Sequence, residues 1–137
     1  MAATVTLTLS AIEAAVRCSW GPDTVFASPE YMARGGGQPS RGQCGTTALV
    51  VQELLGGDLM VADVEHEGRV EGVHYWNVSV GGIELDLTGD QFAAGEALVN
   101  ARRVTMRRNP AGAGEVPFQV LRGRVAAALR AQVAAAS

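Results

Sequence analysis

The chain has 137 residues and a net charge of −3, and its length is typical of a single domain. Hydrophobic residues make up 47% and charged residues 18%, which excludes an intrinsically disordered chain. No apolar run approaches the roughly 18 residues of a membrane span, and an acidic chain lacks the dense basic surface that binds nucleic acid. The N-terminus has no basic region before its apolar stretch, so we expect no signal peptide and a cytoplasmic protein with reduced thiols.

The first half of the chain is predicted to be helical. A capping box that begins at Ser10 starts a helix, and Gly21 with the proline after it ends that helix. A second short helix is expected at 23–33, a loop at 34–42, and a third helix at 44–55 before two glycines. Helical spacing places one set of residues of the first helix on a buried face: Ile12, Ala15, Val16 and Ser19.

The second half is predicted to form an antiparallel sheet and a final helix. Strands are expected at 59–64, 73–80 and 83–87, a helix at 90–100, a short edge strand at 104–107, a loop at 109–114 and a helix at 118–135. We find no internal repeat. The order of elements predicts one α+β domain over residues 1–137.

Cys44 stands where a thiol becomes reactive. It follows the Gly-rich loop and begins the predicted helix 44–55, whose first N–H groups and dipole can stabilise a thiolate and bind a developing oxyanion. Gly42 and Gly45 lie on either side, so the backbone can turn sharply and a substrate can approach closely. For this position alone, the alternative is a buried cysteine that packs as a small hydrophobe.

His74 and Asp86 add two further parts of a cysteine-enzyme site. His74 lies near the start of one predicted strand and Asp86 lies in the next. Taken singly, they favour a core histidine and a surface aspartate. Together with Cys44 on a helix end, they supply a nucleophile, a base and a group that orients the base.

Three stretches resemble the YunG family of small bacterial proteins. They are GQCGTTA at 42–48, HYWN at 74–77 and DLTGDQF at 86–92. The resemblance covers about residues 18–92 well and the C-terminal third more loosely. The pattern G-Q-C-x-x-T-A, H-Y-W-N and D-L-T-x-x-Q-F is specific.

More distantly, the layout is similar to the transglutaminase-like and papain-like superfamily of cysteine enzymes. That resemblance implies Cys44 as the nucleophile, His74 as the general base and Asp86 as its orienter, in amide hydrolysis, transamidation or acylation of amines. It also implies a small papain/transglutaminase-like core. In such a core the nucleophile helix packs on the antiparallel sheet, with N-terminal helices before it and a C-terminal helix after it.

The turn between the last two predicted strands decides whether this triad can form. If 81–82 made a plain two-residue turn, Asp86 would point away from His74. A three-residue loop with a left-handed glycine, or a bulge, shifts the register by one. Trp76 then lies opposite Asp86, with His74 diagonally within reach. We predict this odd-length connection.

Four other polar or aromatic residues are candidates for the site. Gln43 or Gln38 could donate to an oxyanion, Gln38 because papain-like enzymes place that glutamine several residues before the cysteine. Trp76 either covers the His–Asp pair or is plain core. Asn77 could line the site, although pairing with a neighbouring element is the favoured interpretation.

Other residues carry weaker signals. Cys18 lies in an apolar helix face, so we expect it to be buried and inert. Gln91 and Phe92 are interpreted as structural. The ligand spacing of a zinc site is missing, so we expect no metal, and no cofactor motif is present.

The charge is unevenly distributed. Residues 1–101 carry 4 Arg and 13 acidic side chains, whereas residues 102–137 carry 7 Arg and one acidic side chain. The densest basic segment, Arg102–Arg108, could be a solvated face or could dock an acidic carrier protein or an anionic substrate.

These features predict a cysteine-dependent acyl-transfer enzyme. The chain is short for such an enzyme, so we expect a small substrate, or a cleft completed by a second copy in a homodimer. A specialised acyl or amide substrate would suit a biosynthetic pathway. The alternative is a domain of the same fold that binds a small molecule or a protein without catalysis.

Overall fold

The computed structural model describes residues 7–104 and 109–136. Its elements, in chain order, are α1 (Leu9–Ser19), the 3-10 turn η1 (Pro22–Thr24), α2 (Pro29–Ala33), α3 (Cys44–Leu55), β1 (Asp58–His66), β2 (Arg69–Val78), β3 (Glu84–Leu85), β4 (Glu96–Val104) and α4 (Glu115–Ala136). The strands form one antiparallel sheet in the order β3-β2-β1-β4. The predicted α+β class is confirmed.

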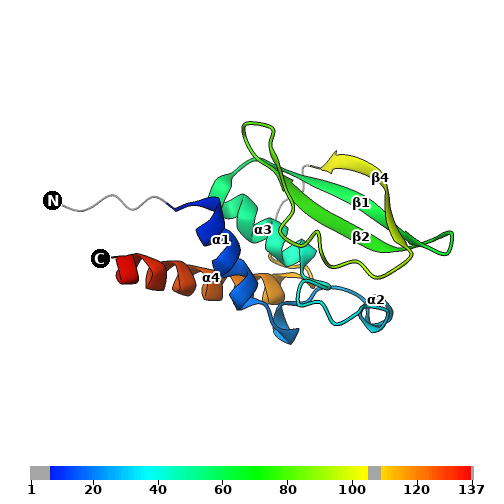
Figure 1. Ribbon diagram of the computed structural model, residues 1–137, viewed down its shortest axis with the longest axis horizontal. Helices are drawn as coiled ribbons and strands as arrows, with labels where there is room; N and C mark the ends of the chain where they lie inside the picture. The colour runs from blue at the N-terminus through cyan, green and yellow to red at the C-terminus, as the bar shows by residue number, and fades with distance from the viewer. Residues whose placement is uncertain (1–6, 105–108, 137) are drawn as a thin grey trace.

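Helix α3 is the central element of the molecule. It lies between the sheet and the pair formed by α1 and α4, and it contacts β2 on one side and α4 on the other (Figure 1). Helices α1 and α4 pack along each other. One face of α3 therefore lies along β2, where Cys44 and Ala48 contact the strand, whereas Val50 and Val51 face a core made of helices.

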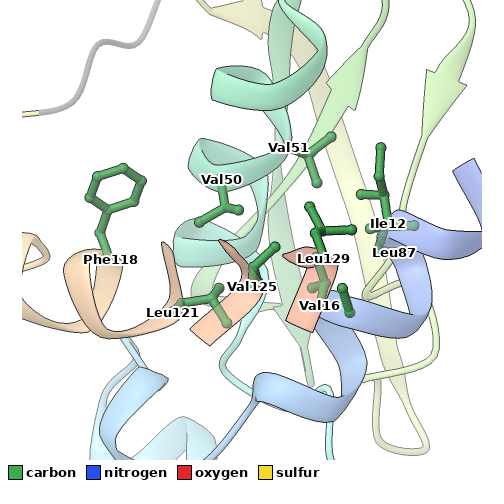
Figure 2. Packing of buried hydrophobic residues seen from close by; sticks show 10 residues of the cluster. Ile12, Val16, Val50, Val51, Leu87, Phe118, Leu121, Val125 and Leu129 are labelled. Carbon is green, nitrogen blue, oxygen red and sulfur yellow. The ribbon is translucent and has the colours of Figure 1, made fainter. Parts of the chain in front are cut away.

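The main hydrophobic core fills the space between α1, α3 and α4 (Figure 2). Its members are Ile12, Ala15, Val16, Val50, Val51, Leu87, Phe118, Leu121, Val125 and Leu129. The buried face predicted for the first helix is confirmed. Leu87 reaches this core from the loop after β3, and burying one such side chain stabilises a fold by roughly 1.5–3 kcal/mol. The residue before it, Asp86, is thereby tied to the core.

The ends of the helices depend on local backbone chemistry. The N-cap of α1 is Thr8, whose hydroxyl accepts from the backbone N–H of Ala11 at 3.1 Å, so the prediction of Ser10 as the cap is wrong. Ser10 already lies inside the helix, whereas Thr8 has the extended backbone of a cap. Helix α3 ends as predicted at Gly56, which has a φ of +72°.

The single helix predicted at 23–33 is two short pieces, η1 and α2. Pro29 begins α2, and Ser28 before it is extended, with a ψ of 151°. A proline disfavours the helical conformation of the residue that precedes it, so one continuous helix cannot pass through this point.

The helix predicted at 90–100 is wrong, because residues 96–104 form strand β4. This strand pairs with the open edge of β1, with Val64 opposite Leu98 and Met60 opposite Arg103. Pairing along a free sheet edge outweighed the local helical preference. Val104 ends β4, and the rest of the predicted edge strand 104–107 lies outside the described residues.

In the part of the chain that the structure describes, no helix is both long enough and apolar enough to cross a bilayer.

Candidate functional site

The Cys44 thiol lies at the first residue of α3. Gly42, two residues earlier, has a φ of +75°, and a Cβ there would come within 2.5 Å of the sulfur of Met32, so the turn into the helix requires glycine. The N–H groups of the first turn have no acceptor within the helix. Cys44 is only 7% exposed, and its Sγ lies 3.8 Å from the carbonyl oxygen of Val73 on β2. The thiol is therefore held where α3 meets the sheet.

The imidazole of His74 comes from β2 and is fully buried. Its Nε2 lies 2.8 Å from Oδ2 of Asp86, whose side chain is 32% exposed. Asp86 directly follows β3. The predicted meeting of these two side chains is confirmed.

The β2–β3 connection has the predicted odd length. The N–H of Ser79 donates to the carbonyl of Ile83 at 2.8 Å, which leaves the three residues 80–82 in the loop. Gly82 has a φ of +85°, the left-handed conformation that this loop type needs. The next pair in register is Val78 with Glu84. Continued by two residues, this register places the aspartate after β3 on the same face as the histidine.

Two aromatic rings pack on the His74 ring. Trp76 is stacked at a centroid distance of 5.4 Å and an angle of 22°, and its indole N–H donates to Glu84 at 3.2 Å. Phe92 meets the imidazole edge-on at 4.9 Å. Trp76 therefore covers the histidine, which was one of the two interpretations offered for it. Phe92 covers another side of the same ring.

The charge state of His74 results from opposing effects. Burial lowers its pKa, whereas the hydrogen bond with Asp86, the hydrogen bond with Cys44 and the negative charges of both raise it. The raising effects dominate, and the pKa rises from 6.5 to about 9. An imidazolium can thus persist at neutral pH beside these two groups.

Gln91 is a member of the site that the sequence analysis treated as structural. It is completely buried, and its Nε2 lies 3.0 Å from Nδ1 of His74. Its Oε1 accepts from the hydroxyl of Tyr31 at 2.8 Å and from the N–H of Gly42 at 3.3 Å. Its place in the DLTGDQF stretch, five residues after the predicted orienter, was the signal that could have found it.

A buried ion pair supports the segment after β3 that carries Gln91. The Arg41 guanidinium donates to the Glu96 carboxylate at 3.0 Å, and both side chains are almost completely buried. Arg41 also lies 3.5 Å from the centre of the Tyr31 ring and donates to the carbonyl of Gln91 at 3.2 Å. Burial raises the pKa of Glu96, but hydrogen bonds from Arg41, from the backbone and from Arg34 lower it from 4.5 to about 2.

The predicted oxyanion glutamines do not reach the thiol. The Gln43 amide donates to the carbonyl of Gly21 at 3.1 Å and accepts from Thr24 at 2.7 Å, so its side chain is committed elsewhere. Gln38 accepts from the N–H of Gly36 at 3.0 Å and lines a cavity that Cys44 does not share.

Asn77 binds a neighbouring element, which was the favoured interpretation. Its side-chain amide donates to the carbonyl of Ala48 at 2.9 Å and so ties β2 to α3. It does not line the cavity at the thiol.

Two small cavities share Phe26 as a lining residue. One, of about 220 Å³, is lined by Cys44, Tyr31, Glu71 and Val73 among others. The other, of about 210 Å³, lies over the first turns of α3 and is lined by Gly45, Leu49 and Tyr75 among others. Both are below the roughly 300–1,000 Å³ of typical ligand pockets.

Two other predictions concern the surface. Cys18 is exposed, so the prediction that it is buried is wrong; it lies beside the face of α1 that packs in the core. Arg102 and Arg103 lie next to carboxylates of β1, at 3.3 Å from Asp63 and 3.0 Å from Asp58. Arg107 and Arg108 lie outside the described residues.

Comparison with known proteins finds a family and a relative that are similar to this chain. It matches the family described as "YunG protein" over residues 8–130. It is 43% identical over 56 residues to "Uncharacterized protein YunG" of Bacillus subtilis (strain 168), a stretch that covers 41% of this chain and 44% of that protein. No solved structure matches.

Proposed function

The chain belongs to the YunG family, and for this member we propose a cysteine-dependent acyl-transfer activity. The reaction is hydrolysis of an amide or thioester, or transfer of its acyl group to an amine. The observation that carries the proposal is the buried His74 ring, which holds Asp86 at 2.8 Å on Nε2, beside a Cys44 thiol that lies 3.8 Å from the carbonyl oxygen of the preceding residue, Val73. In a cysteine enzyme these three residue types serve as the nucleophile, the base and the orienting carboxylate.

The chemistry proceeds in two halves. The Cys44 thiol passes its proton to His74, and the thiolate beside the imidazolium attacks the carbonyl carbon of the substrate. When the tetrahedral intermediate collapses, the bond to the leaving group breaks, His74 gives its proton to that group, and an acyl-thioester remains on Cys44. Water or an amine then attacks the thioester, loses a proton to His74, and the released thiolate regains that proton.

Backbone N–H groups supply the oxyanion site in this proposal. The two glutamines predicted for that role are turned away, but the first N–H groups of α3, at Cys44 and Gly45, have no acceptor within the helix. A Cβ on Gly45 would have nothing nearer than Tyr75 at 3.8 Å, so there is room beside this backbone. Donors fixed on a helix end stabilise a developing negative charge without having to reorient.

Several finer features belong to the same proposal. The Cys–His–Asp layout on α3 and the sheet supports a small papain/transglutaminase-like core. The two small cavities support a small acyl or amide substrate, or a cleft completed by a second copy. The chemistry requires a reduced Cys44, so the proposal places the protein in the cytoplasm. A specialised acyl or amide substrate would suit a biosynthetic pathway. Docking of an acidic carrier at Arg102–Arg108 remains part of this proposal.

Intact mass spectrometry tests the proposed function. In a Cys18→Ser background, which removes the exposed thiol, the protein is mixed with short acyl thioesters and aryl esters. We expect a mass gain equal to the acyl group, absent in Cys44→Ala. Subsequent addition of an amine or incubation in water should remove the gain and identify the acceptor.

The binding-domain alternative predicts a different result. In that case no acyl donor modifies Cys44, and iodoacetamide reacts with the folded protein no faster than with its Asp86→Asn variant. That pair of results would overturn the enzyme proposal.

A further inference from the structure

The orientation of the Gln91 amide is determined by its surroundings. Its Oε1 faces two donors, the Tyr31 hydroxyl and the Gly42 N–H. Its Nε2 faces two acceptors of Thr88, the carbonyl at 3.3 Å and the hydroxyl at 3.2 Å. A flipped amide would place its NH₂ group against the Gly42 N–H and its oxygen against the Thr88 carbonyl, so Nε2 is the atom that points at the His74 ring.

This orientation dictates where the ring carries its proton. An N–H of Gln91 can bind Nδ1 of His74, 3.0 Å away, only if Nδ1 has a free lone pair. The Asp86 carboxylate, 2.8 Å from Nε2, accepts a proton from that nitrogen. Both neighbours therefore select the same neutral tautomer, with the proton on Nε2 and the lone pair on Nδ1.

We propose that Gln91 is a positioning residue that holds His74 in the Nε2–H tautomer and whose N–H competes with an incoming proton for Nδ1. The inference rests on the proposed function for its catalytic meaning, because Nδ1 is then the base that receives the thiol proton. Proton transfer to Nδ1 requires the Gln91 N–H to release it. Gln91 thus limits how readily the imidazolium forms.

The other groups around the ring do not provide this control. Asp86 and Cys44 both favour the imidazolium. Burial raises the pKa of Tyr31 to about 12, so its hydroxyl remains a neutral donor. The charges of Arg41 and Glu96 neutralise each other in a buried ion pair. In the described part of the chain, Gln91 is the contact of the ring that stabilises its neutral form.

Nuclear magnetic resonance of the histidine side chains tests the assignment without any need for turnover. The chain has only two histidines, and His66 at the end of β1 serves as an internal reference. We expect the ¹⁵N shifts of neutral His74, recorded above its titration, to show a protonated Nε2 and an unprotonated Nδ1. A neutral ring protonated on Nδ1 would overturn the proposal, even if every variant failed to fold.

Two substitutions test the competition for Nδ1. Gln91→Met removes the donor, so the titration of His74 should move upward by about half a unit or more, the size expected for one neutral hydrogen bond. Gln91→Glu should move it further, because a carboxylate accepts from Nδ1–H. Gln43→Met is the matched control: this glutamine is equally buried but has no contact with the ring, and the titration should not move.

The outcomes separate this inference from the proposed function. A folded Gln91→Met protein in which His74 titrates as in the wild type refutes the competition for Nδ1. If the tautomer and the shifts are as expected but Cys44 accepts no acyl group, the assignment of Gln91 stands and the acyl-transfer proposal fails. In Cys44→Ala the neutral tautomer should persist, because Asp86 and Gln91 select it.

Discussion

At the scale of single residues, the His74 ring combines contacts that oppose each other. Burial favours the neutral ring, whereas Asp86 and Cys44 favour the charged ring and raise its pKa from 6.5 to about 9. Because the folded value is the higher one, the charged ring stabilises the fold fully below about pH 6.5. This contribution disappears as the pH rises through about 9. The protonation of His74 therefore changes both the charge of the site and the free energy of unfolding.

Asp86→Asn should weaken the charged form of His74 without removing the side chain that orients it. An amide oxygen can still accept from Nε2–H, but it carries no charge. We expect Cys44 to react with iodoacetamide at pH 7 about tenfold more slowly or worse, since a hydrogen bond to a charged group contributes about 1.5–3 kcal/mol. The measurement is the alkylation rate in the Cys18→Ser background.

Glu84→Gln is the control for this substitution. Glu84 is also an acid of the β2–β3 hairpin, but it binds the indole of Trp76 and not the imidazole. Its replacement should leave the alkylation rate almost unchanged. Equal rates in Asp86→Asn and in the wild type would show that the carboxylate does not support the thiol.

At the scale of elements, α3 and β2 hold the two halves of the site, and one short junction joins them. After α3, the chain passes through Gly56 and Gly57 into β1, which pairs with β2. Gly57 has a φ of +82°, and a Cβ there would come within 2.2 Å of the carbonyl oxygen of Val78 at the end of β2. The close approach of helix and strand therefore depends on a position without a side chain.

Gly57→Ala should destabilise the fold strongly. A matched control is Gly68→Ala in the β1–β2 turn, where φ is +75° and a Cβ would meet nothing within 4 Å. The control should lower the free energy of unfolding by about 1–2 kcal/mol, the strain of a left-handed alanine. Gly57→Ala should lower it by about 1–3 kcal/mol more through the clash. Urea denaturation measures both, and equal losses would refute the steric argument.

The elements also show what the sequence could reveal. The bounds of α3, the three-residue loop and the His74–Asp86 pairing follow from local signals: a Gly-rich turn before Cys44, a glycine pair and strand alternation. Strand β4 and the orientation of the glutamine predicted to bind an oxyanion depend on tertiary structure instead. Residues 96–104 extend because β1 has an open edge, and Gln43 turns away because Gly21 and Thr24, some twenty residues earlier, supply its partners.

At the scale of the whole molecule, one buried ion pair joins distant parts of the chain. Glu96 at the start of β4 accepts from Arg41 in the loop before Cys44 and from Arg34 after α2. The pKa of its carboxyl group is lowered to about 2 in the fold. Because this value lies below the ordinary 4.5, the pair stabilises the protein above about pH 4.5. The stabilisation disappears as the pH falls through about 2.

Glu96→Gln should therefore reduce the acid sensitivity of the fold. In the wild type, the free energy of unfolding should fall by up to about 3 kcal/mol between pH 5 and pH 2 through this group. In the variant, which is less stable at pH 7, that decrease should be smaller by the same amount. Urea denaturation at several pH values is the measurement.

Asp23→Asn is the control at this scale. Asp23 pairs with Arg124 on the surface, and exposed ion pairs contribute only about 0–1 kcal/mol. Its replacement should hardly alter the pH dependence. A Glu96→Gln variant as acid-sensitive as the wild type would show that Glu96 is not the group responsible.

The distribution of the site along the chain has a consequence for biosynthesis. Cys44, His74 and Asp86 come from a helix, a strand and a loop that meet only when the sheet is paired and Leu87 is packed in the helical core. A nascent or misfolded chain therefore carries Cys44 without His74, Asp86 or a helix end beside it. If Cys44 is the proposed nucleophile, its reactivity toward acyl donors should therefore appear only when the chain has folded.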